Sequence, residues 1–496
     1  MTIASTRSGK VEGFERDGVQ VFLGIPYAAP PIGERRWAPP VREEAWEGVR
    51  PAQEFGSQSA QTDFAMNLLM GAGQPPNSED SLYLNVWTPA CDDKRRPVMF
   101  WIHGGAFMWG AGDTPWYDGA NFALHGDVVV VSINYRLAAF GFLHLADLFD
   151  GAFAGSGNAA LLDQIAALEW VRDSIEAFGG DPNRVTIFGE SAGAACTATL
   201  LGTPAARSLF VGAIPQSGGA SWTATRESAT EVAAGILQRL GVQPGDKDAL
   251  LSKSTAEVLA AMPEFTENGT AQLPFQPVVD DVVLPRPPLD TIAAGNADGV
   301  HLLVGTNRHE MTLFTMMDPN LATLDEDAII NRVEKVIGGG ASTFVRDYRS
   351  RRSDETVQAL WNDIATDAMF RMPAIDLAQA QLGHGPVWSY LFTWETPVFG
   401  GLLRSTHALE IPFVFDNLAR NTEMFTGTGA ERQGIADAMH PAWIAFARTG
   451  NPHHRGLPAW PEYDTTRRAT MRFDTTCEVL DDPNGADRAA YAAAAQ

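Results

Sequence analysis

The segment that decides the fold reads Arg184-Val-Thr-Ile-Phe-Gly189-Glu190-Ser191-Ala192-Gly193-Ala194. An apolar strand candidate runs straight into the pattern G-x-S-x-G, and the Ala- and Thr-rich start of a helix follows it. A turn this sharp strains the backbone of its serine, and only small flanking residues let the two chain segments pass each other. The order therefore predicts that Ser191 is a nucleophile lifted clear of a sheet edge, with the Ala192 N–H and the helix N-terminus aimed at a reacting carbonyl.

Around this segment, strand candidates alternate with helical patterns. The stretch 158–178 has a helical period, with apolar residues recurring on one side. Short apolar runs before and after it fit strands that are buried on both faces. This alternation predicts an α/β fold with a central, mostly parallel sheet and helices on both faces. The strand candidates are residues 98–102, 128–133, 185–188, 212–215, 301–305 and 387–394.

Two later stretches, about 226–261 and about 328–381, have mainly helical patterns and lack buried strand candidates. We expect them to be helical insertions near the active site rather than separate domains. No Pro/Ser-rich linker, charge block or internal repeat divides the chain. Residues 1–496 are therefore predicted to form a single catalytic domain.

A glycine-rich loop follows the strand candidate 98–102, in the order Trp101-Ile-His103-Gly104-Gly105-Ala106-Phe107. Glycines let a backbone approach an oxyanion closely and turn its N–H groups toward it. The alternative is a plain glycine turn that ends a strand. Because such a loop is the expected companion of a G-x-S-x-G turn, we assign the N–H groups of Gly105 and Ala106 as oxyanion donors beside Ala192. Gly104 should provide the bend of the loop, and His103 should support it.

The catalytic base should be a histidine that follows both Ser191 and the acid in the chain. Of the ten histidines, His407 is the preferred candidate because it comes after the strand candidate 387–394 and a Gly-Gly loop. A loop after a late strand can bring an imidazole to the serine. A single histidine is more often structural, so the residues alone support this choice only weakly.

The acid should precede the base and follow a strand. Glu310 lies beyond a turn after the strand candidate 301–305. Asp280 and Asp281 are rivals, in a segment that fits a hairpin or an extended surface segment. A carboxylate in this role holds the correct tautomer of the imidazole and stabilises the imidazolium. The residues alone leave the choice among these carboxylates open.

The composition of the chain indicates which binding partners and which cellular compartment to expect. The chain has 60 acidic and 36 basic residues and a net charge of −24, which repels phosphate backbones and anionic lipids, so nucleic acid and membranes are not expected. The three cysteines give neither a disulfide framework nor metal-ligand spacing. The polar N-terminal stretch lacks the apolar core of a secretory signal, and no apolar run is long enough to span a membrane. We therefore expect a soluble, cytoplasmic protein, and a monomer is compatible with the sequence.

Further motifs stand in order along the chain: FLGIPYAAPPIGERRW at 22–37, SEDSLYLNVWTP at 78–89, WIHGGAF at 101–107, NYRLAAFGFL at 134–143, AFGGDPNRVTIFGESAGA at 177–194, GTNRHE at 305–310, HALEIPFVF at 407–415 and FARTGNP at 446–452. Together they resemble the type-B carboxylesterases, the cholinesterase-like branch of the α/β-hydrolases, and within it the bacterial para-nitrobenzyl esterases. The resemblance spans nearly the whole chain and implies the α/β-hydrolase fold and a serine esterase. In this family the acid is a glutamate and the base is the histidine of H-x-x-E-[IL]-P, which favours Glu310 and His407.

The chain departs from this family in the loop between Ser59 and Ser81. These serines stand where relatives carry two bridged cysteines, so the loop is not stapled, as suits a reducing compartment. The loop also lacks the tryptophan by which cholinesterases hold choline, so we expect uncharged, partly apolar ester substrates. Its apolar candidates for substrate contact are Phe64, Met66, Leu68 and Met70.

Aromatic residues near the motifs are candidates for the substrate pocket. They are Phe107, Trp109, Trp222 and Phe314. By position, Trp222 and Phe314 resemble the acyl-pocket residues of the family. For each of these residues, plain core packing is the alternative.

Other activities are compatible with part of this pattern. Non-catalytic adhesion relatives have lost the serine, and enzymes of this fold with an aspartate nucleophile are excluded by Ser191. An amide or carbamate hydrolase would use the same residues. Ester cleavage is the default because an alkoxide leaves without prior protonation, whereas an amine must first be protonated by the histidine. The chemistry needs no metal or cofactor, and the expected partner is a small-molecule ester.

Overall fold

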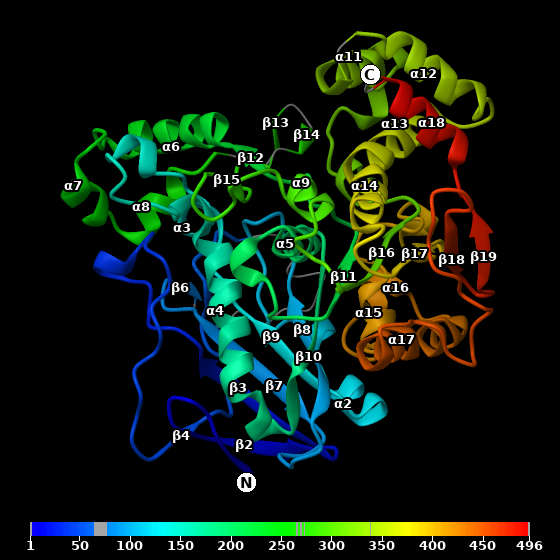
Figure 1. The fold of residues 1–496 in the computed structure, drawn as a ribbon. Helices are drawn as coiled ribbons and strands as arrows, with labels where there is room; N and C mark the ends of the chain where they lie inside the picture. The colour runs from blue at the N-terminus through cyan, green and yellow to red at the C-terminus, as the bar shows by residue number, and fades with distance from the viewer. Residues whose placement is uncertain are drawn as a thin grey trace.

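The structure is a computed structural model that describes residues 2–63, 77–263, 266–267, 270–271, 273–337 and 339–494. Its centre is one large sheet with helices on both faces (Figure 1). From one edge to the other, the strands are β1 (Thr2–Ser5), β2 (Lys10–Arg16), β3 (Val19–Pro26), β7 (Tyr83–Thr88), β9 (Val129–Ile133), β8 (Arg96–Ile102), β10 (Gly180–Glu190), β11 (Gly212–Gln216), β16 (His301–Asn307), β17 (Val387–Phe392), β18 (Ala469–Phe473) and β19 (Glu478–Asp481), with β4 (Val49–Pro51) beside β2.

The sheet is parallel in its middle and antiparallel toward its edges. Every neighbouring pair from β9 to β18 runs parallel. The pairs β1–β2, β2–β3, β3–β7, β7–β9 and β18–β19 run antiparallel. The expected mostly parallel sheet is thus confirmed. Because the carboxyl ends of parallel strands share one edge of a sheet, residues that follow β8, β10 and β16 can meet there.

Strand β8 shows why helices cover both faces. Its side chains Val98, Phe100 and Ile102 belong to one hydrophobic core, and Met99 and Trp101 belong to a second one. Successive side chains of a strand point to opposite faces, so an uninterrupted apolar run requires cover on both. The first core includes α4 (Ala159–Ser174) and α5 (Ala192–Leu201), and the second includes α2 (Ala120–Gly126) and α17 (Glu431–Thr449).

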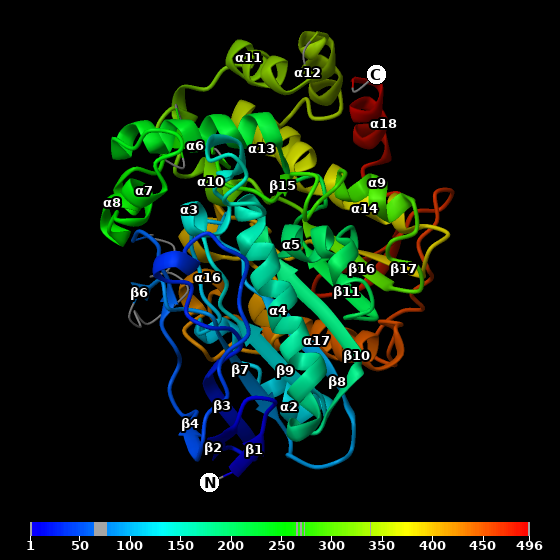
Figure 2. The same cartoon turned by 60° about the vertical axis from the view of Figure 1, so that its left-hand side comes forward.

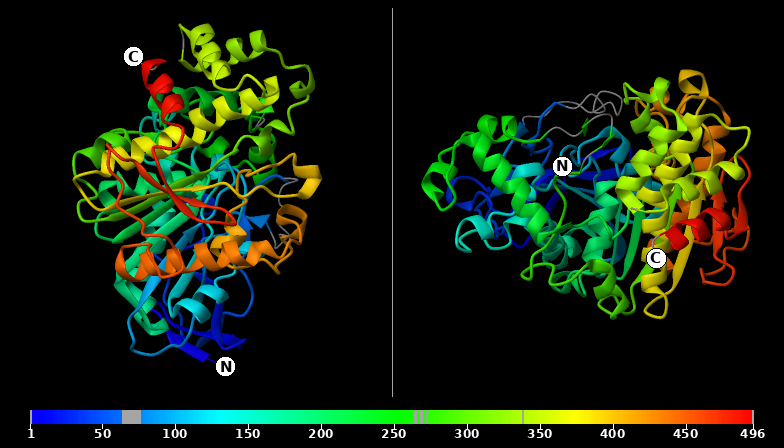
Figure 3. Two further views of the ribbon diagram at one scale, coloured as in Figure 1. Left: turned by 90° about the vertical axis from the view of Figure 1, so that its right-hand side faces the viewer. Right: turned by 90° about the horizontal axis from the view of Figure 1, so that it is seen from above.

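The mainly helical stretches lie at the end of the molecule opposite the N-terminus (Figures 1 and 2). The C-terminal helix α18 (Gly485–Ala494) packs there beside α12 (Ala341–Ser350) (Figure 3). That these stretches are insertions within a single domain stays a prediction. The first contains α6 (Arg226–Leu240), α7 (Lys247–Leu251) and α8 (Thr255–Ala260). The second contains α11 (Glu326–Ile337), α12 (Ala341–Ser350), α13 (Val357–Thr366), a π-turn (Asp367–Arg371) and α14 (Met372–Gln381).

The bounds of the expected strands lie within two residues of those observed, except that β10 begins at Gly180 and not at 185. The helix expected at 158–178 is α4, which ends at Ser174 and is completed by a short 3-10 turn, Ile175–Phe178. The strand expected at 387–394 is β17, which ends at Phe392. Among the described residues, no helix combines the length and the apolar character that a membrane crossing requires.

Candidate active site

Ser191 occupies a strained turn between β10 and α5. Its φ of 59° and ψ of −123° lie outside the regions that non-glycine residues ordinarily adopt. The glycines on either side have no room for a side chain. A Cβ on Gly189 would lie 2.5 Å from the carbonyl oxygen of Ile102, and one on Gly193 only 2.0 Å from it. The pattern G-x-S-x-G is therefore required by the close approach of this turn to the end of β8.

The loop after β8 lies directly beside this turn. Gly105 has a φ of 116°, and a Cβ there would lie 2.1 Å from the carbonyl oxygen of Trp109. Ala106 also has a left-handed φ, of 54°. The bend thus comes from Gly105 and not, as expected, from Gly104. Gly104 is needed for a different reason, because a Cβ there would lie 2.6 Å from the carbonyl oxygen of Glu190.

No acceptor in the described part of the chain takes a hydrogen bond from the N–H groups of the three assigned oxyanion donors. Within the described chain, the N–H groups of Gly105 and Ala106 donate to no protein acceptor. Ala192 is the first residue of α5, so its N–H has no acceptor within the helix. All three flank Ser191 in the chain or in space. The geometry suits an anion, although their role stays a prediction.

His103 is buried behind the oxyanion loop. Its Nδ1 lies 2.8 Å from the carbonyl oxygen of Gly104, and its ring stacks on Tyr135 with centroids 4.5 Å apart. The Tyr135 hydroxyl donates a 2.7 Å hydrogen bond to the carbonyl of His103. Burial lowers the pKa of His103 to about 4, which keeps the ring neutral. His103 therefore lies where a support of the loop is needed.

His407 and Glu310 meet at the same sheet edge. Nδ1 of His407 lies 2.7 Å from Oε2 of Glu310, and both side chains are buried. The other oxygen of Glu310 accepts a 2.6 Å hydrogen bond from the Asn307 N–H at the end of β16. The Asn307 side chain donates to the carbonyl of Thr406, at 2.7 Å. One asparagine thus fixes both the acid and the loop that carries the base.

The rival carboxylates lie in a different environment. Asp280 follows the short strand β15 (Val278–Val279), is buried, and accepts hydrogen bonds from the backbone N–H groups of Val282 and Val283. Of the two expected forms, a hairpin or an extended surface segment, the second is not found here, because the Asp280 carboxylate closes a tight turn. Asp281 is exposed, and its carboxylate lies 3.5 Å from Arg226 Nη1. Neither aspartate has a contact with His407 in the described structure.

The second nitrogen of His407 faces a carboxylate. Nε2 lies 3.1 Å from Oε1 of Glu190. Among the described residues, Nε2 has no hydrogen-bond partner, so the bond to Ser191 Oγ is not formed in this structure. In a free enzyme such bonds are often long or poorly aligned and tighten when substrate binds. Glu190, the residue before Ser191, therefore competes with Ser191 for Nε2 of His407.

Three buried carboxylates surround this imidazole. Burial raises the pKa of Glu190 well above its ordinary value, although the neighbouring His407 opposes the rise. Burial and then repulsion from Glu310 raise the pKa of Glu410 to about 7. Burial by itself would lower the pKa of His407, but attraction to Glu190 and the hydrogen bond to Glu310 outweigh it and raise that pKa to about 9. The cluster as a whole favours an extra proton.

A cavity opens onto Ser191 and His407. Among the described residues, its lining is mostly apolar and aromatic and includes no lysine or arginine. Of the expected pocket residues, Trp109, Trp222 and Phe314 line it. The further lining residues are Gly104, Gly105, Ala106, Gly110, Thr114, Trp116, Tyr117, Glu190, Leu273, Met311, Leu313, Met369, Phe370, Ala408 and Phe425.

Phe107 was expected in the pocket wall but does not line the cavity. Its side chain is fully buried, and its ring packs against Phe142 with centroids 5.2 Å apart. Ala106 and Phe107 both have a left-handed φ, which reverses the chain and turns the Phe107 ring into the core. Its ring contacts Trp222, a lining residue, at a centroid distance of 6.5 Å.

Glu410 and Phe370 are among the residues of the site that the sequence did not reveal. Glu410 accepts hydrogen bonds from Gln216 and Asn307, at 3.1 and 2.7 Å. Its spacing of three residues from His407, within H-A-L-E, was a signal that could have indicated it. Phe370 lies with its ring centroid 4.8 Å from that of His407. Its place in a helical stretch carries no such signal, since only packing brings the π-turn to the cavity.

Ser59 and Ser81, which were expected to stand in place of two bridged cysteines, are in contact. Ser59 Oγ donates a 2.9 Å hydrogen bond to Ser81 Oγ. Cys91, Cys196 and Cys477 are all free thiols. The candidate contacts Phe64, Met66, Leu68 and Met70 lie outside the described residues.

A strained serine between strand and helix, beside free N–H groups and a buried histidine–glutamate pair, defines a serine hydrolase of the α/β-hydrolase fold. The model of the carboxylesterase family matches residues 1–490. The chain therefore belongs to the carboxylesterase family and is a carboxylic ester hydrolase, which favours ester cleavage over the amide or carbamate alternative.

Named relatives and solved structures agree with this membership. The chain is 41% identical to the para-nitrobenzyl esterase of Bacillus subtilis, over 98% of this chain and 97% of the relative. It is 36% identical to the phenmedipham hydrolase of Pseudarthrobacter oxydans, over 93% and 92% of the two chains. The crystal structure of a Geobacillus stearothermophilus carboxylesterase at pH 6.2 superposes with a TM-score of 0.91 at 44% identity, covering 99% of this chain and 100% of that one.

Proposed function

We propose that Ser191 is the nucleophile, His407 the general base and Glu310 the acid of a catalytic triad. The observation that carries this proposal is the buried contact of 2.7 Å between His407 Nδ1 and Glu310 Oε2 beside the strained serine. The glutamate holds the imidazole so that Nε2 is free to accept a proton, and it stabilises the imidazolium that forms. The N–H groups of Gly105, Ala106 and Ala192 would hold the oxyanion.

The reaction then runs through an acyl-enzyme. His407 removes the hydroxyl proton as Ser191 attacks the ester carbonyl, and the tetrahedral oxyanion forms against the three N–H groups. The alcohol leaves with the proton from His407. Water, activated by the same imidazole, then attacks the acyl-serine and releases the acid. Each step needs Nε2 to turn from Glu190 toward Ser191.

The direct test is removal of the nucleophile and of the base. Ser191→Ala should lower kcat for an activated ester by about 10⁶-fold, and His407→Ala should be comparably damaging, because triad residues act as a unit. Thermal melting of both variants serves as the control for folding. Full turnover by either variant would overturn the assignment.

We further propose that the substrates are uncharged, partly apolar carboxylic esters. Support comes from the cavity wall, in which Glu190 is the single carboxylate among the described lining residues. Trp109, Trp116 and Trp222 also line the cavity. Aromatic rings can hold a quaternary ammonium, so the lack of a tryptophan between Ser59 and Ser81 does not decide by itself against choline esters.

The proposed compartment is the cytoplasm. The free thiols and the contact between Ser59 and Ser81 support a reducing environment. The only partner required by the proposed reaction is the small-molecule ester. Fractionation of native cells, with a periplasmic marker enzyme as control, tests the location.

A further inference from the structure

A π-turn in the cavity wall joins the active site to the distant C-terminal helix. Helix α13 passes into the π-turn Asp367–Arg371 and then into α14. Such turns are rare and are frequently found at functional sites. Here Met369 and Phe370 line the cavity. The Phe370 ring centroid lies 4.8 Å from that of His407 and 5.4 Å from that of Trp222. The turn thus forms a wall beside the base.

Buried polar groups tie down both ends of this turn. Asp367 is fully buried, accepts a 2.8 Å hydrogen bond from the Tyr348 hydroxyl of α12, and pairs with Arg371. Nη2 of Arg371 also donates a 3.1 Å hydrogen bond to the carbonyl of Arg308, in the loop that carries Glu310. A buried carboxylate that loses such partners is strongly destabilised. The shape of the π-turn therefore depends on side chains outside the cavity.

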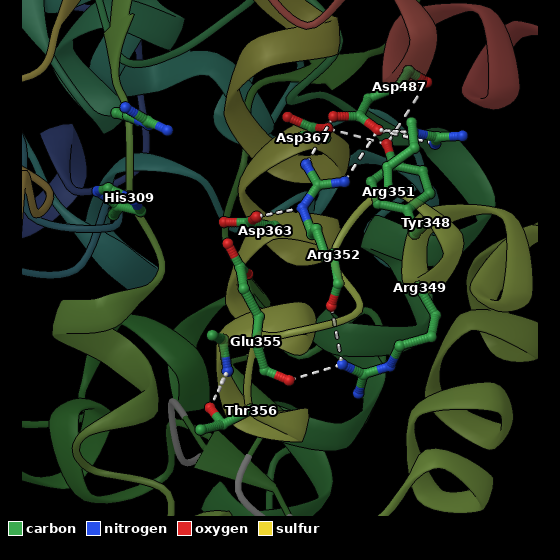
Figure 4. A network of polar contacts seen from close by, with 12 residues as sticks. His309, Tyr348, Arg349, Arg351, Arg352, Glu355, Thr356, Asp363, Asp367 and Asp487 are labelled. Carbon is green, nitrogen blue, oxygen red and sulfur yellow. Dashed lines mark hydrogen bonds and ion pairs between the residues drawn. The ribbon is translucent and has the colours of Figure 1, made fainter.

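The C-terminal helix α18 supplies the next contact through Asp487 (Figure 4). This buried carboxylate accepts hydrogen bonds from Arg351 Nε at 2.8 Å and from Arg352 Nη1 and Nη2 at 3.0 and 2.6 Å. Nε of Arg352 donates to Asp363 of α13 at 2.5 Å. Both guanidinium carbons lie 5.1 Å from the centroid of the Tyr348 ring. Asp487 thus orders the same tyrosine that holds the π-turn.

We propose that Asp487 and Tyr348 are positioning residues that set the size of the acyl group, within the ester substrate, that the cavity accepts. With both in place, the Phe370 ring is held against His407 and Trp222 and offers a large acyl group a packed surface. When either contact is lost, the π-turn shifts and that surface is lost, whereas a small acetyl group needs little of the wall. This inference rests on the proposed esterase function.

Two conservative variants separate this role from stability alone. Asp487→Asn keeps the shape and removes the charge, and Tyr348→Phe removes a single hydroxyl. Turnover of 4-nitrophenyl acetate and 4-nitrophenyl octanoate is compared, with melting temperatures measured in parallel. The matched control is Asp481→Asn, since Asp481 forms an exposed pair with Arg467 outside this network. For the octanoate, KM should rise about tenfold in both variants, as a misfitting apolar pocket allows. For the acetate, kcat/KM should stay close to that of the control.

The outcomes are distinct. An unchanged ratio of octanoate to acetate kcat/KM in both variants, even with lower melting temperatures, means that the contacts only stabilise the fold, and the proposal is then wrong. If Asp487→Asn does not fold, Tyr348→Phe decides by the same ratio. If the unmodified protein hydrolyses neither ester, the proposed function fails, and this is visible before any variant is compared.

Discussion

The turn around Ser191 and the wall formed by the π-turn face the same cavity but are held in place by different means. At the turn, the backbone itself is the constraint, since a side chain on Gly189 or Gly193 would collide with the carbonyl oxygen of Ile102. At the wall, the constraint consists of side-chain contacts, from Asp367 outward to Asp487 on the C-terminal helix. The constraint at the turn involves five consecutive residues, whereas the constraint at the wall involves residues that are far apart in the chain.

This difference indicates that the turn governs the chemical step, whereas the wall governs the selectivity among esters. The turn and the oxyanion loop have no freedom to vary without losing the position of the nucleophile. We expect the wall to tolerate small shifts of its helices, because side-chain contacts rather than a backbone collision hold it in place. Substitutions at the turn should therefore affect all esters alike, and substitutions at the wall should affect some esters more than others.

The largest expected loss of activity that tests this contrast comes from a substitution of the proposed catalytic acid, Glu310. Glu310→Gln should lower kcat by about 10⁴-fold, the scale on which the acid of such a triad acts, because the imidazole loses its orienting carboxylate. Asp281→Asn is the matched control, since Asp281 is an exposed carboxylate in a pair with Arg226. Steady-state kinetics with 4-nitrophenyl acetate measures both. A large loss in the control together with a small loss in Glu310→Gln would show that the wrong carboxylate was chosen.

The next largest effect concerns the oxyanion loop. Gly105→Ala should reduce kcat by about 10²- to 10³-fold, the range for losing one oxyanion donor, because its Cβ meets the Trp109 carbonyl and displaces the N–H groups. Gly18→Ala is the control, since Gly18 also has a positive φ, of 80°, but open space around it. Equal loss of acetate and octanoate turnover is expected for Gly105→Ala. Activity close to normal would mean that this loop does not hold the oxyanion.

A pH profile tests the cluster around the base. Only neutral His407 can accept the serine proton, and its pKa is raised to about 9, so kcat/KM should fall as the pH drops below about 9. Glu190→Gln removes a negative charge from the imidazole and should move this acidic limb to lower pH. Glu410→Gln, the last of the contributing carboxylates, should move it less. A limb near the ordinary histidine value that does not respond to Glu190→Gln would contradict the described electrostatics.

The smallest expected effect concerns the charge of the substrate. Butyrylcholine and its neutral analogue 3,3-dimethylbutyl butyrate differ in one cationic group, and a good cation–π contact contributes about 1–2 kcal/mol. We expect the neutral ester to have a kcat/KM at least equal to that of the choline ester, and clearly higher once salt screens the net charge of −24. A choline preference that persists in high salt would show that the tryptophans of the cavity form a cation site.

The same contrast explains what the sequence could and could not predict. Ser191, its glycines and the oxyanion loop follow from local patterns, because the steric demands act between close neighbours in the fold. Glu310 and His407 are far apart in the chain, and only the resemblance to a family favoured them over other candidates. Phe107 was misplaced because a motif does not reveal a left-handed φ, which turned its ring into the core.

The wall formed by the π-turn shows most clearly what the sequence could not predict. Phe370 lies in a helical stretch with no motif, and its place beside His407 results from a π-turn held by distant polar contacts. Nothing in the periodicity of residues 357–381 indicates where such a turn will occur. Likewise, Gly104 and Gly105 are adjacent and alike in sequence, and only their surroundings show that one allows a close approach and the other makes the bend.

The most direct test of the central claim is to trap the acyl-enzyme and locate the acyl group. A 4-nitrophenyl ester with a bulky acyl group that deacylates slowly should release a burst of one 4-nitrophenol per active chain, because acylation precedes the slower hydrolysis. Acid quenching, digestion and mass spectrometry should then find the acyl group on the peptide that contains Ser191. The label should be absent from Ser191→Ala. Turnover without a burst, or an acyl group on any other residue, would contradict the proposed triad.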